Sequence, residues 1–521
     1  MPMSKRKNYS IGIFLNPYEK INPMKKYFLF MIAGFALSAQ AQEVSDAMRY
    51  AQDNLTGTAR FRGMSGAFGA LGGDFSAIGV NPAGSAVFTT NQIAITLSNY
   101  STSNKSRYFG TTTKENDNSF DLNQLGAIWV FENQDASSNW KKFTVAANYE
   151  NVSNFDNQFH ASGFNPTNSV SNYFSSYANG IPLGDITNIP FGSMTYREQQ
   201  AYFGYNGYLI NPSTNSNNNI VYTSNTPAGG NYYQENFIES TGYNGKLSFN
   251  GGVQFTDRFY FGLNLNSHFT DYTRVSNFYE DYMDTPGNNP NSGPQGLRFR
   301  NELYTYGNGF SFQVGAIAKV TPELRVGVAY ESPTWFRLNE ELRQSLIVDC
   351  PDCGTRNPVV VDPNLTMIYP SYRLQTPGKY TGSLAYVFGK YGLISIDYAM
   401  KDYSNMRFRP SNDYRQTNAQ LESLLDVTSE VRIGAEAKAK QWSFRGGYRF
   451  EQSPYKNGKT IGDLQGFSAG LGYNFGGTRL DAAYSYAKRD MQQTFFSQGL
   501  VDATTVKSVS NNVTLTLLLD L

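Results

Sequence analysis

The chain has little of what catalysis and metal binding need. Its 521 residues include two cysteines, two histidines and four tryptophans, and 16% of them are charged. The histidines, His160 and His268, lie far apart in the sequence, so a Ser-His-Asp arrangement or a metal centre has few ligands to draw on. We therefore expect no enzyme activity, no metal and no cofactor. A hydrolase that uses His268 is the alternative.

Charge of one sign is also missing. The 43 Lys and Arg residues balance the 42 Asp and Glu residues, which leaves a net charge of +1. Such a balance gives no support to nucleic-acid binding, because that needs a basic surface. The mean hydropathy of −0.45 is typical of a soluble chain. This average is a weak guide, since alternating polar and apolar residues cancel over any window.

The two cysteines form the sequence Cys350-Pro351-Asp352-Cys353. In an exported chain this spacing favours a small loop disulfide, with free thiols as the next alternative. A redox site would need a thioredoxin-like βαβ setting, which the surrounding sequence lacks. A zinc site would need two further ligands.

Long apolar runs are absent, with one exception near the start of the chain. Residues 27–39 are apolar, follow Lys25 and Lys26, and end in Ala39-Gln40-Ala41. This is the pattern of a secretory signal peptide over residues 1–41, cleaved after Ala41, and a buried helix is the alternative. Residues 1–23 add nothing to it, so Met24 is a candidate start. No later run is long enough for a transmembrane helix, so any membrane span must be β.

What the chain does have is alternation. Along 430–439 and 442–451, apolar residues alternate with polar or charged ones, and two residues separate the stretches. Side chains of a strand point to opposite faces in turn, so this predicts a tight hairpin with one apolar and one charged face. The apolar face carries Trp442, Phe444, Tyr448 and Phe450, which suit lipid and its interface.

Similar alternation recurs from residue 91 to the end of the chain. It predicts about fourteen strands, at 92–100, 124–131, 143–150, 246–255, 259–270, 310–320, 324–331, 380–388, 393–400, 430–439, 442–451, 467–475, 479–488 and 512–521. Short and long connections alternate between them. The long ones are 101–123, 151–245, 271–309, 332–379, 401–429, 452–466 and 489–511. Together these features predict an all-β, antiparallel transmembrane barrel with turns at one end and long extracellular loops at the other, over residues 91–521.

Residues 42–90 do not alternate and are rich in small residues. The stretch 62–74 contains five glycines, and Asn81-Pro82-Ala83-Gly84 follows it. Neither a Gly-Lys-Ser/Thr ending nor a βαβ frame is present, so a phosphate loop is disfavoured. We expect an N-terminal plug of short helices and Gly-rich turns inside the barrel. With an even strand count it should start at the turn end, in the periplasm.

The charged face of the predicted hairpin has two interpretations. Arg432, Lys438, Arg445 and Arg449 should face the lumen, where they could contact an acidic head group. Glu436 and Glu451 lie beside them, and a cross-strand charge ladder is the favoured alternative. Aromatic loop stretches at 173–177, 202–208 and 335–336 could capture a ligand, or could simply pack the loops together.

In this order, the features resemble the FadL-type outer-membrane transporters of long-chain fatty acids and other hydrophobic compounds. Further matching stretches are 60–63, 325–333 and 444–448 with Ser453-Pro454. The resemblance implies a plugged barrel whose hatch includes Asn81, Pro82, Ala83 and Gly84, and a lateral opening near the third strand. The stretch 143–150 has no Gly or Pro that would mark a kink there, and the Cys350/Cys353 pair is not part of the family pattern.

The resemblance also implies a function. We expect a bacterial outer-membrane protein, monomeric and in contact with membrane lipid and lipopolysaccharide, that passes a long-chain fatty acid or a similar hydrophobic molecule by diffusion and releases it sideways. The alternative is a docking or assembly barrel for secretion or surface attachment, or a haemin-receptor-like protein, although the two histidines give little support for haem ligation.

Overall fold

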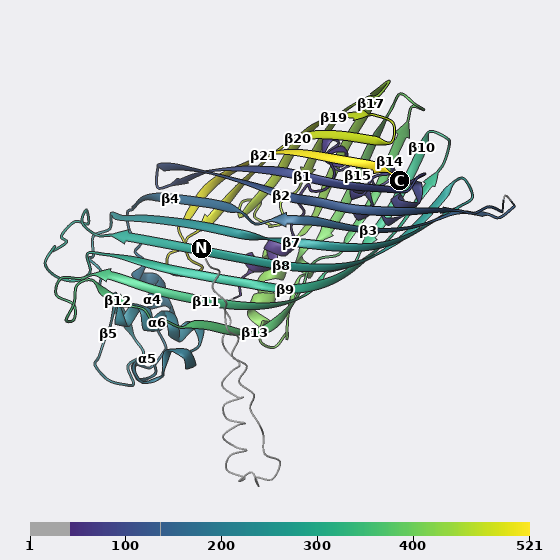
Figure 1. The fold of residues 1–521 in the computed structure, drawn as a ribbon. Helices are drawn as coiled ribbons and strands as arrows, with labels where there is room; N and C mark the ends of the chain where they lie inside the picture. The colour runs from purple at the N-terminus through teal and green to yellow at the C-terminus, as the bar shows by residue number, and fades with distance from the viewer. Residues whose placement is uncertain (1–41, 136) are drawn as a thin grey trace, which may run out of the picture. The chain divides into compact units, whose positions relative to one another are not determined.

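The computed structural model describes residues 42–135 and 137–521, so the predicted signal peptide lies outside the described residues. Fourteen antiparallel strands form a closed wall, because β1 pairs with both β2 and β21. This confirms the predicted barrel (Figure 1). The wall strands are β1 (Gln92–Tyr108), β2 (Thr111–Glu132), β3 (Trp140–Asn154), β7 (Tyr232–Phe255), β8 (Phe259–Asp281), β9 (Gly296–Lys319), β10 (Leu324–Glu331), β14 (Lys379–Val387), β15 (Gly392–Asp402), β17 (Val427–Ala439), β18 (Trp442–Glu451), β19 (Ile461–Asn474), β20 (Thr478–Thr494) and β21 (Ala503–Asp520).

One end of the wall, here called the turn end, has short connections such as 256–258, 440–441 and 475–477. At the other, the loop end, several strands run much further than the alternation of apolar residues predicts. The expected loop 101–123 is wrong, since β1 and β2 continue as a ladder to a two-residue turn at Phe109-Gly110. These extensions are built from Ser, Thr, Asn and Asp, which satisfy their backbone in the ladder but carry no apolar signal.

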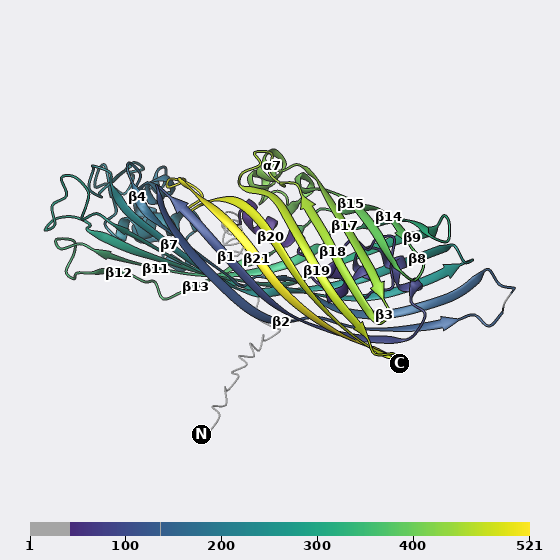
Figure 2. The ribbon, with the colours of Figure 1, turned by 90° about the horizontal axis from the view of Figure 1, so that it is seen from above.

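Additional elements gather at the loop end (Figures 1 and 2). The strands are β4 (Asn157–Asn165), β5 (Ile210–Pro212), β6 (Tyr222–Ser224), β11 (Trp335–Asp349), β12 (Val359–Val361), β13 (Thr366–Gln375) and β16 (Arg407–Arg409). The helices are α4 (Ser171–Ala178), α5 (Leu183–Asn188), α6 (Tyr196–Asn206) and α7 (Arg415–Leu424), with short 3-10 turns η3 (Phe191–Ser193) and η4 (Tyr403–Asn405). None of the helices within the described ranges is long and apolar enough to cross a membrane.

The hairpin β17–β18 shows how the wall divides its faces. Trp442 and Phe444 are 44% and 52% exposed on the outside, while Arg432, Arg445 and Arg449 are buried inside. The same division holds along the turn half of the other strands, where outward residues such as Phe143, Phe261 and Leu515 are exposed. An apolar outer band of this kind is what a membrane wall requires.

Residues 42–88 thread the lumen as α2 (Val44–Ala51), α3 (Ala59–Gly63), η1 (Ser76–Gly79) and η2 (Pro82–Val87). The expected start of this segment at the turn end is wrong. Gln42 donates a 2.5 Å hydrogen bond to Glu340 of β11 in the loop half, and α2 packs with Phe336, Tyr372 and residues of α7. The even strand count places the ends of the wall at the turn end, but the plug runs through the lumen before it reaches β1.

Candidate functional site

The part of the plug from α3 to η2, residues 59–87, is here called the lower plug, and it is held by glycines of the wall that face the lumen. A Cβ atom built on Gly262 would lie 2.2 Å from the carbonyl carbon of Pro82, and one built on Gly327 would lie 2.3 Å from the carbonyl oxygen of Gly69. Cβ atoms built on Gly434 and Gly447 would lie 2.6 Å from Met64 and Ser65, and one built on Gly470 would lie 3.2 Å from Gly63. Backbone therefore packs directly on backbone at this level, and a larger residue would displace the plug.

The predicted hatch turn belongs to this tightly packed layer. The Asn81 side chain accepts from the N–H of Ala83 at 3.2 Å and donates to the carbonyl oxygens of Gly69 at 2.7 Å and Ala316 at 3.1 Å. Pro82 begins η2, where a missing N–H is tolerated. Asn81, Pro82, Ala83 and Gly84 are all buried, so the turn anchors the plug to β8 and β9.

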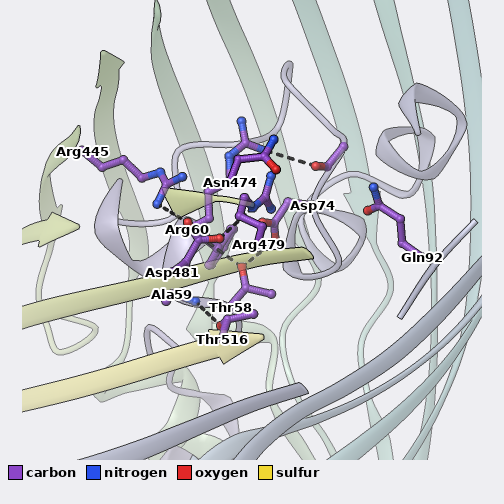
Figure 3. Close-up of polar contacts among 12 residues, drawn as sticks. Thr58, Ala59, Arg60, Asp74, Gln92, Arg445, Asn474, Arg479, Asp481 and Thr516 are labelled. Carbon is purple, nitrogen blue, oxygen red and sulfur yellow. Dashed lines mark hydrogen bonds and ion pairs between the residues drawn. The ribbon is translucent and has the colours of Figure 1, made fainter. Parts of the chain in front are cut away.

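A buried charge cluster joins α3 to three wall strands (Figure 3). Arg60 lies 3.0 Å from Glu436, and Arg445 bridges Glu436 and Asp481 at 2.7 Å each. Arg479 adds a contact of 2.8 Å to Asp481. Because Arg445 already binds two carboxylates, the structure favours the charge-ladder interpretation for it.

The other three cations predicted to face the lumen differ in how they are paired and how exposed they are. Arg432 pairs with Glu430 at 2.6 Å, and Lys438 is half exposed at 3.6 Å from Glu436. Arg449 is buried, and its Nη1 atom has no hydrogen-bond partner among the described residues. It faces a cavity of about 330 Å³, together with Arg489. Of the four, Arg449 has the best geometry for a ligand.

Two cavities lie above the lower plug, on either side of the extended segment 52–56. The larger one is lined by Asn154 and Asn157 as well as Arg449. The smaller one, of about 140 Å³, is lined by Asp53, Lys379, Lys401 and His268. Gln52, Asn54 and Thr56 line both, so this segment is the partition between the cavities.

The wall has a discontinuity beside both cavities. The ladder between β2 and β3 runs from Glu132↔Lys142 to Gln124↔Glu150 and stops there. Beyond it, residues 111–123 of β2 face residues 151–165, a boundary that we call the seam. Register shifts at β1–β2 and β3–β7 flank this point, and such irregularities bend strands away from their neighbours.

Side chains make the contacts across the seam. Asn154 donates to Ser119 at 3.1 Å, Asn123 donates to the carbonyl oxygen of Asn151 at 3.4 Å, and Asn151 contacts Asp121. The third strand itself breaks at Phe155 and Asp156 before β4 begins. The stretch 143–150 has no Gly or Pro that would mark a kink, and the break in the strand lies just after this stretch, next to Asn154 and Asn157.

The family model for outer membrane protein transport proteins (OMPP1/FadL/TodX) matches residues 209–515, which is more than half of the chain. The chain belongs to this family. Its fold is similar to that of a FadL homologue from Pseudomonas aeruginosa, with 14% identity over 90% of this chain and 99% of that one and a TM-score of 0.53. The Pseudomonas putida toluene transporter TodX gives 14% identity, coverage of 90% and 99%, and a TM-score of 0.51. No curated protein sequence matches the chain.

Membership in the FadL/TodX family places the barrel in the outer membrane, and this family transports hydrophobic compounds. The two histidines have different surroundings. His268 contacts the buried hydroxyl of Ser311 at 3.0 Å, and its other ring nitrogen has no partner in the part of the chain that is described. His160 lies between Glu115 and Glu235, away from both cavities. Neither histidine joins a nucleophile to an orienting carboxylate.

The loop-end aromatics of this FadL/TodX-family chain are mostly core residues. Tyr173, Phe174 and Phe203 are buried in one cluster with Phe299 and Phe495, and Phe336 is buried beside α2. Trp335 remains 43% exposed on the outside of the wall. The packing interpretation is therefore favoured over ligand capture for these side chains.

The cysteine pair lies in the same loop-end region. Cys350 and Cys353 are joined as a disulfide after β11, and Asp352 accepts hydrogen bonds from Ser292 and Gly293 at 2.6 and 2.7 Å. These contacts tie two loops together at the loop end.

Several residues of the site were missed by sequence reasoning. Asp53, Lys379, Lys401 and Arg489 all line the cavities, and Asn123 lies at the top of the wall ladder. Lys379 and Lys401 flank predicted strands, so alternation could have placed them near the lumen. No sequence pattern marks Asp53 or Asn123 as part of the site, because their contacts depend on which strand the plug approaches.

Proposed function

We propose that this protein moves long-chain fatty acids or similar hydrophobic molecules across the outer membrane, from the loop end into the barrel and then sideways through the seam. The single observation that supports this route most is the end of the β2–β3 ladder at Gln124↔Glu150. Asn154 and Asn157 of the seam line the larger cavity, and Glu150 and Ser153 line the smaller one. The lumen thus reaches the wall at the point where the wall is weakest.

A sideways exit suits a hydrophobic cargo. Each buried CH₂ group is worth about 0.8 kcal/mol, so a long tail avoids an aqueous pore through to the periplasm. The seam begins next to Leu122 and Leu125, which are exposed in the apolar outer band. A tail that leaves there passes from the protein into lipid with little contact with water. The sequence has no nucleotide-binding motif, and a concentration gradient is the natural driver.

Opening the seam should cost far less than opening any other part of the wall. A typical side-chain hydrogen bond contributes only about 0.5–1.5 kcal/mol net. The seam is bridged by side-chain contacts at Thr113, Ser119, Asp121 and Asn123, and by an ion pair of 3.3 Å between Glu115 and His160. To open the wall between any other two of its strands, a continuous ladder of backbone hydrogen bonds would have to break. In this proposal residues 81–84 close the turn end as an anchored hatch, and segment 52–56 moves to let the cargo pass.

The proposal is tested by photoaffinity labelling of the purified protein in lipid nanodiscs. A fatty acid with a diazirine in its tail should label peptides of β2 and β3/β4 around the seam and of segment 52–56. These peptides lie on the proposed route, and an excess of unlabelled oleate should compete for them. Labelling that is confined to the outer apolar band, or that oleate does not reduce, would overturn the route.

A further inference from the structure

One carboxylate of the plug sits between two buried lysines of the wall. Asp53 accepts from Lys379 at 2.7 Å through Oδ2 and from Lys401 at 2.6 Å through Oδ1. Each oxygen therefore has its own ammonium group, which is the arrangement that a bound carboxylate ligand would adopt. Asp53 belongs to no helix or strand, and lies in the extended stretch that follows α2.

The two lysines depend on this stretch to different degrees. Lys379 also contacts Glu430 at 3.1 Å, so it retains a partner when Asp53 moves. Lys401 donates hydrogen bonds to Asp53 and to the carbonyl oxygen of Ala51, both of them on the plug. A buried cation left without an anion is strongly unfavourable, so segment 51–53 is held in place unless another anion replaces it.

The Asp53 side chain is accessible enough for another anion to displace it from the two lysines. Its side chain is 30% exposed, against 13% and 12% for Lys379 and Lys401, and all three line the smaller cavity. Although burial acts to raise the pKa of Asp53, the two lysines hold that pKa well below its usual value. The group in place is thus a charged carboxylate that faces a cavity.

We propose that Lys379 and Lys401 form a binding site for the carboxylate of the cargo, and that Asp53 occupies this site as a built-in competitor. The inference rests on the proposed function and names the chemical class of the ligand: a molecule with a single carboxylate and an apolar tail. Exchange of one carboxylate for another keeps both lysines paired with an anion.

The exchange has a consequence for the shape of the lumen. Asp53 lies inside the partition between the two cavities, so its departure carries segment 52–56 away and joins them. The smaller cavity, of about 140 Å³, cannot hold a long-chain molecule, whereas ligand pockets span roughly 300–1,000 Å³. The ligand therefore makes its own pocket by displacing Asp53, and the enlarged pocket borders the seam.

The test compares laurate with dodecanol, which has the same tail and no charge, in equilibrium binding to the full-length protein in nanodiscs. In Asp53→Asn, laurate should bind about tenfold more tightly, since the loss of one competing charge pair is worth roughly a decade in affinity, and dodecanol should be unchanged. In Lys401→Met, laurate should lose its advantage over dodecanol. Asp257→Asn, in a turn-end connection, is the matched control and should leave both affinities as they are.

A second measurement does not depend on the Asp53 variant. In Asn54→Cys, saturating laurate should speed maleimide labelling at position 54, and dodecanol should not. The inference is overturned if the affinities for laurate and dodecanol change equally in Asp53→Asn. It is also overturned if laurate binds but does not change the rate of maleimide labelling at position 54. In either case the proposed function still stands. If neither ligand binds the wild-type protein, the inference and the proposed function both fail.

Discussion

A disulfide across the seam, made by Asp121→Cys with Asn151→Cys, is expected to reduce fatty-acid uptake to the level of cells that lack the protein. The two side chains are already in contact, so cysteines at these positions would face each other across the seam. It would tie β2 to β3 just above Gln124↔Glu150, where the ladder ends, and so keep the proposed exit closed. Uptake of labelled oleate is measured before and after a reductant is added, and the reductant should restore it.

The matched control joins strands that are fully paired. Ser98→Cys with Thr514→Cys links β1 and β21, whose hydroxyl groups lie 3.0 Å apart inside the lumen. This bond adds nothing to a ladder that is already closed, so uptake should stay at the wild-type rate. Equal inhibition by both disulfides, or none by the seam disulfide, would contradict release through the seam.

Replacement of Arg445 by Met is expected to destabilise the barrel by about 3–5 kcal/mol, because it leaves two buried carboxylates without their shared cation. Arg445 is 1% exposed and lies 2.7 Å from both Glu436 and Asp481. Arg60 of the plug binds the same Glu436, so the plug should loosen as well. The free energy of unfolding is measured by urea titration in lipid vesicles.

Lys438→Met is the control for this prediction. Lys438 contacts the same Glu436, but at 3.6 Å and with 48% of its side chain exposed, so its loss should change stability by less than about 1 kcal/mol. If the two variants unfold alike, and Arg445→Met instead changes only ligand affinity, Arg445 is a head-group contact and the charge-ladder interpretation is wrong.

Alternation was enough to predict the barrel, because one face of each wall strand meets lipid and the other meets the lumen. Trp442, Phe444 and Arg445 are where the sequence places them. Alternation fails where strands leave the membrane. Residues 101–108 pair with 111–118 in a regular ladder of mostly polar residues, and polar residues in a row are typical of loops as well as of exposed strands.

The site was less predictable than the wall, for a physical reason. The plug contacts the wall through backbone atoms and inward glycines, so the positions of Asp53 and Gln42 depend on the path of a segment with few large side chains. The seam begins beside one extra residue, Asn123, which is unpaired in the β1–β2 ladder and belongs to a stretch that was predicted to be a loop. Both features arise from register and docking, which local patterns do not encode.

The central claim, that the protein carries hydrophobic cargo across the outer membrane, is tested most directly by uptake of radiolabelled oleate. Deletion cells, cells complemented with the wild-type chain, and cells complemented with the seam-disulfide variant are compared at equal surface expression. The account predicts rapid uptake with the wild-type chain and the deletion rate with the disulfide variant under oxidising conditions. Equal uptake by deletion and wild-type-complemented cells would contradict it and favour a docking role for the loop end.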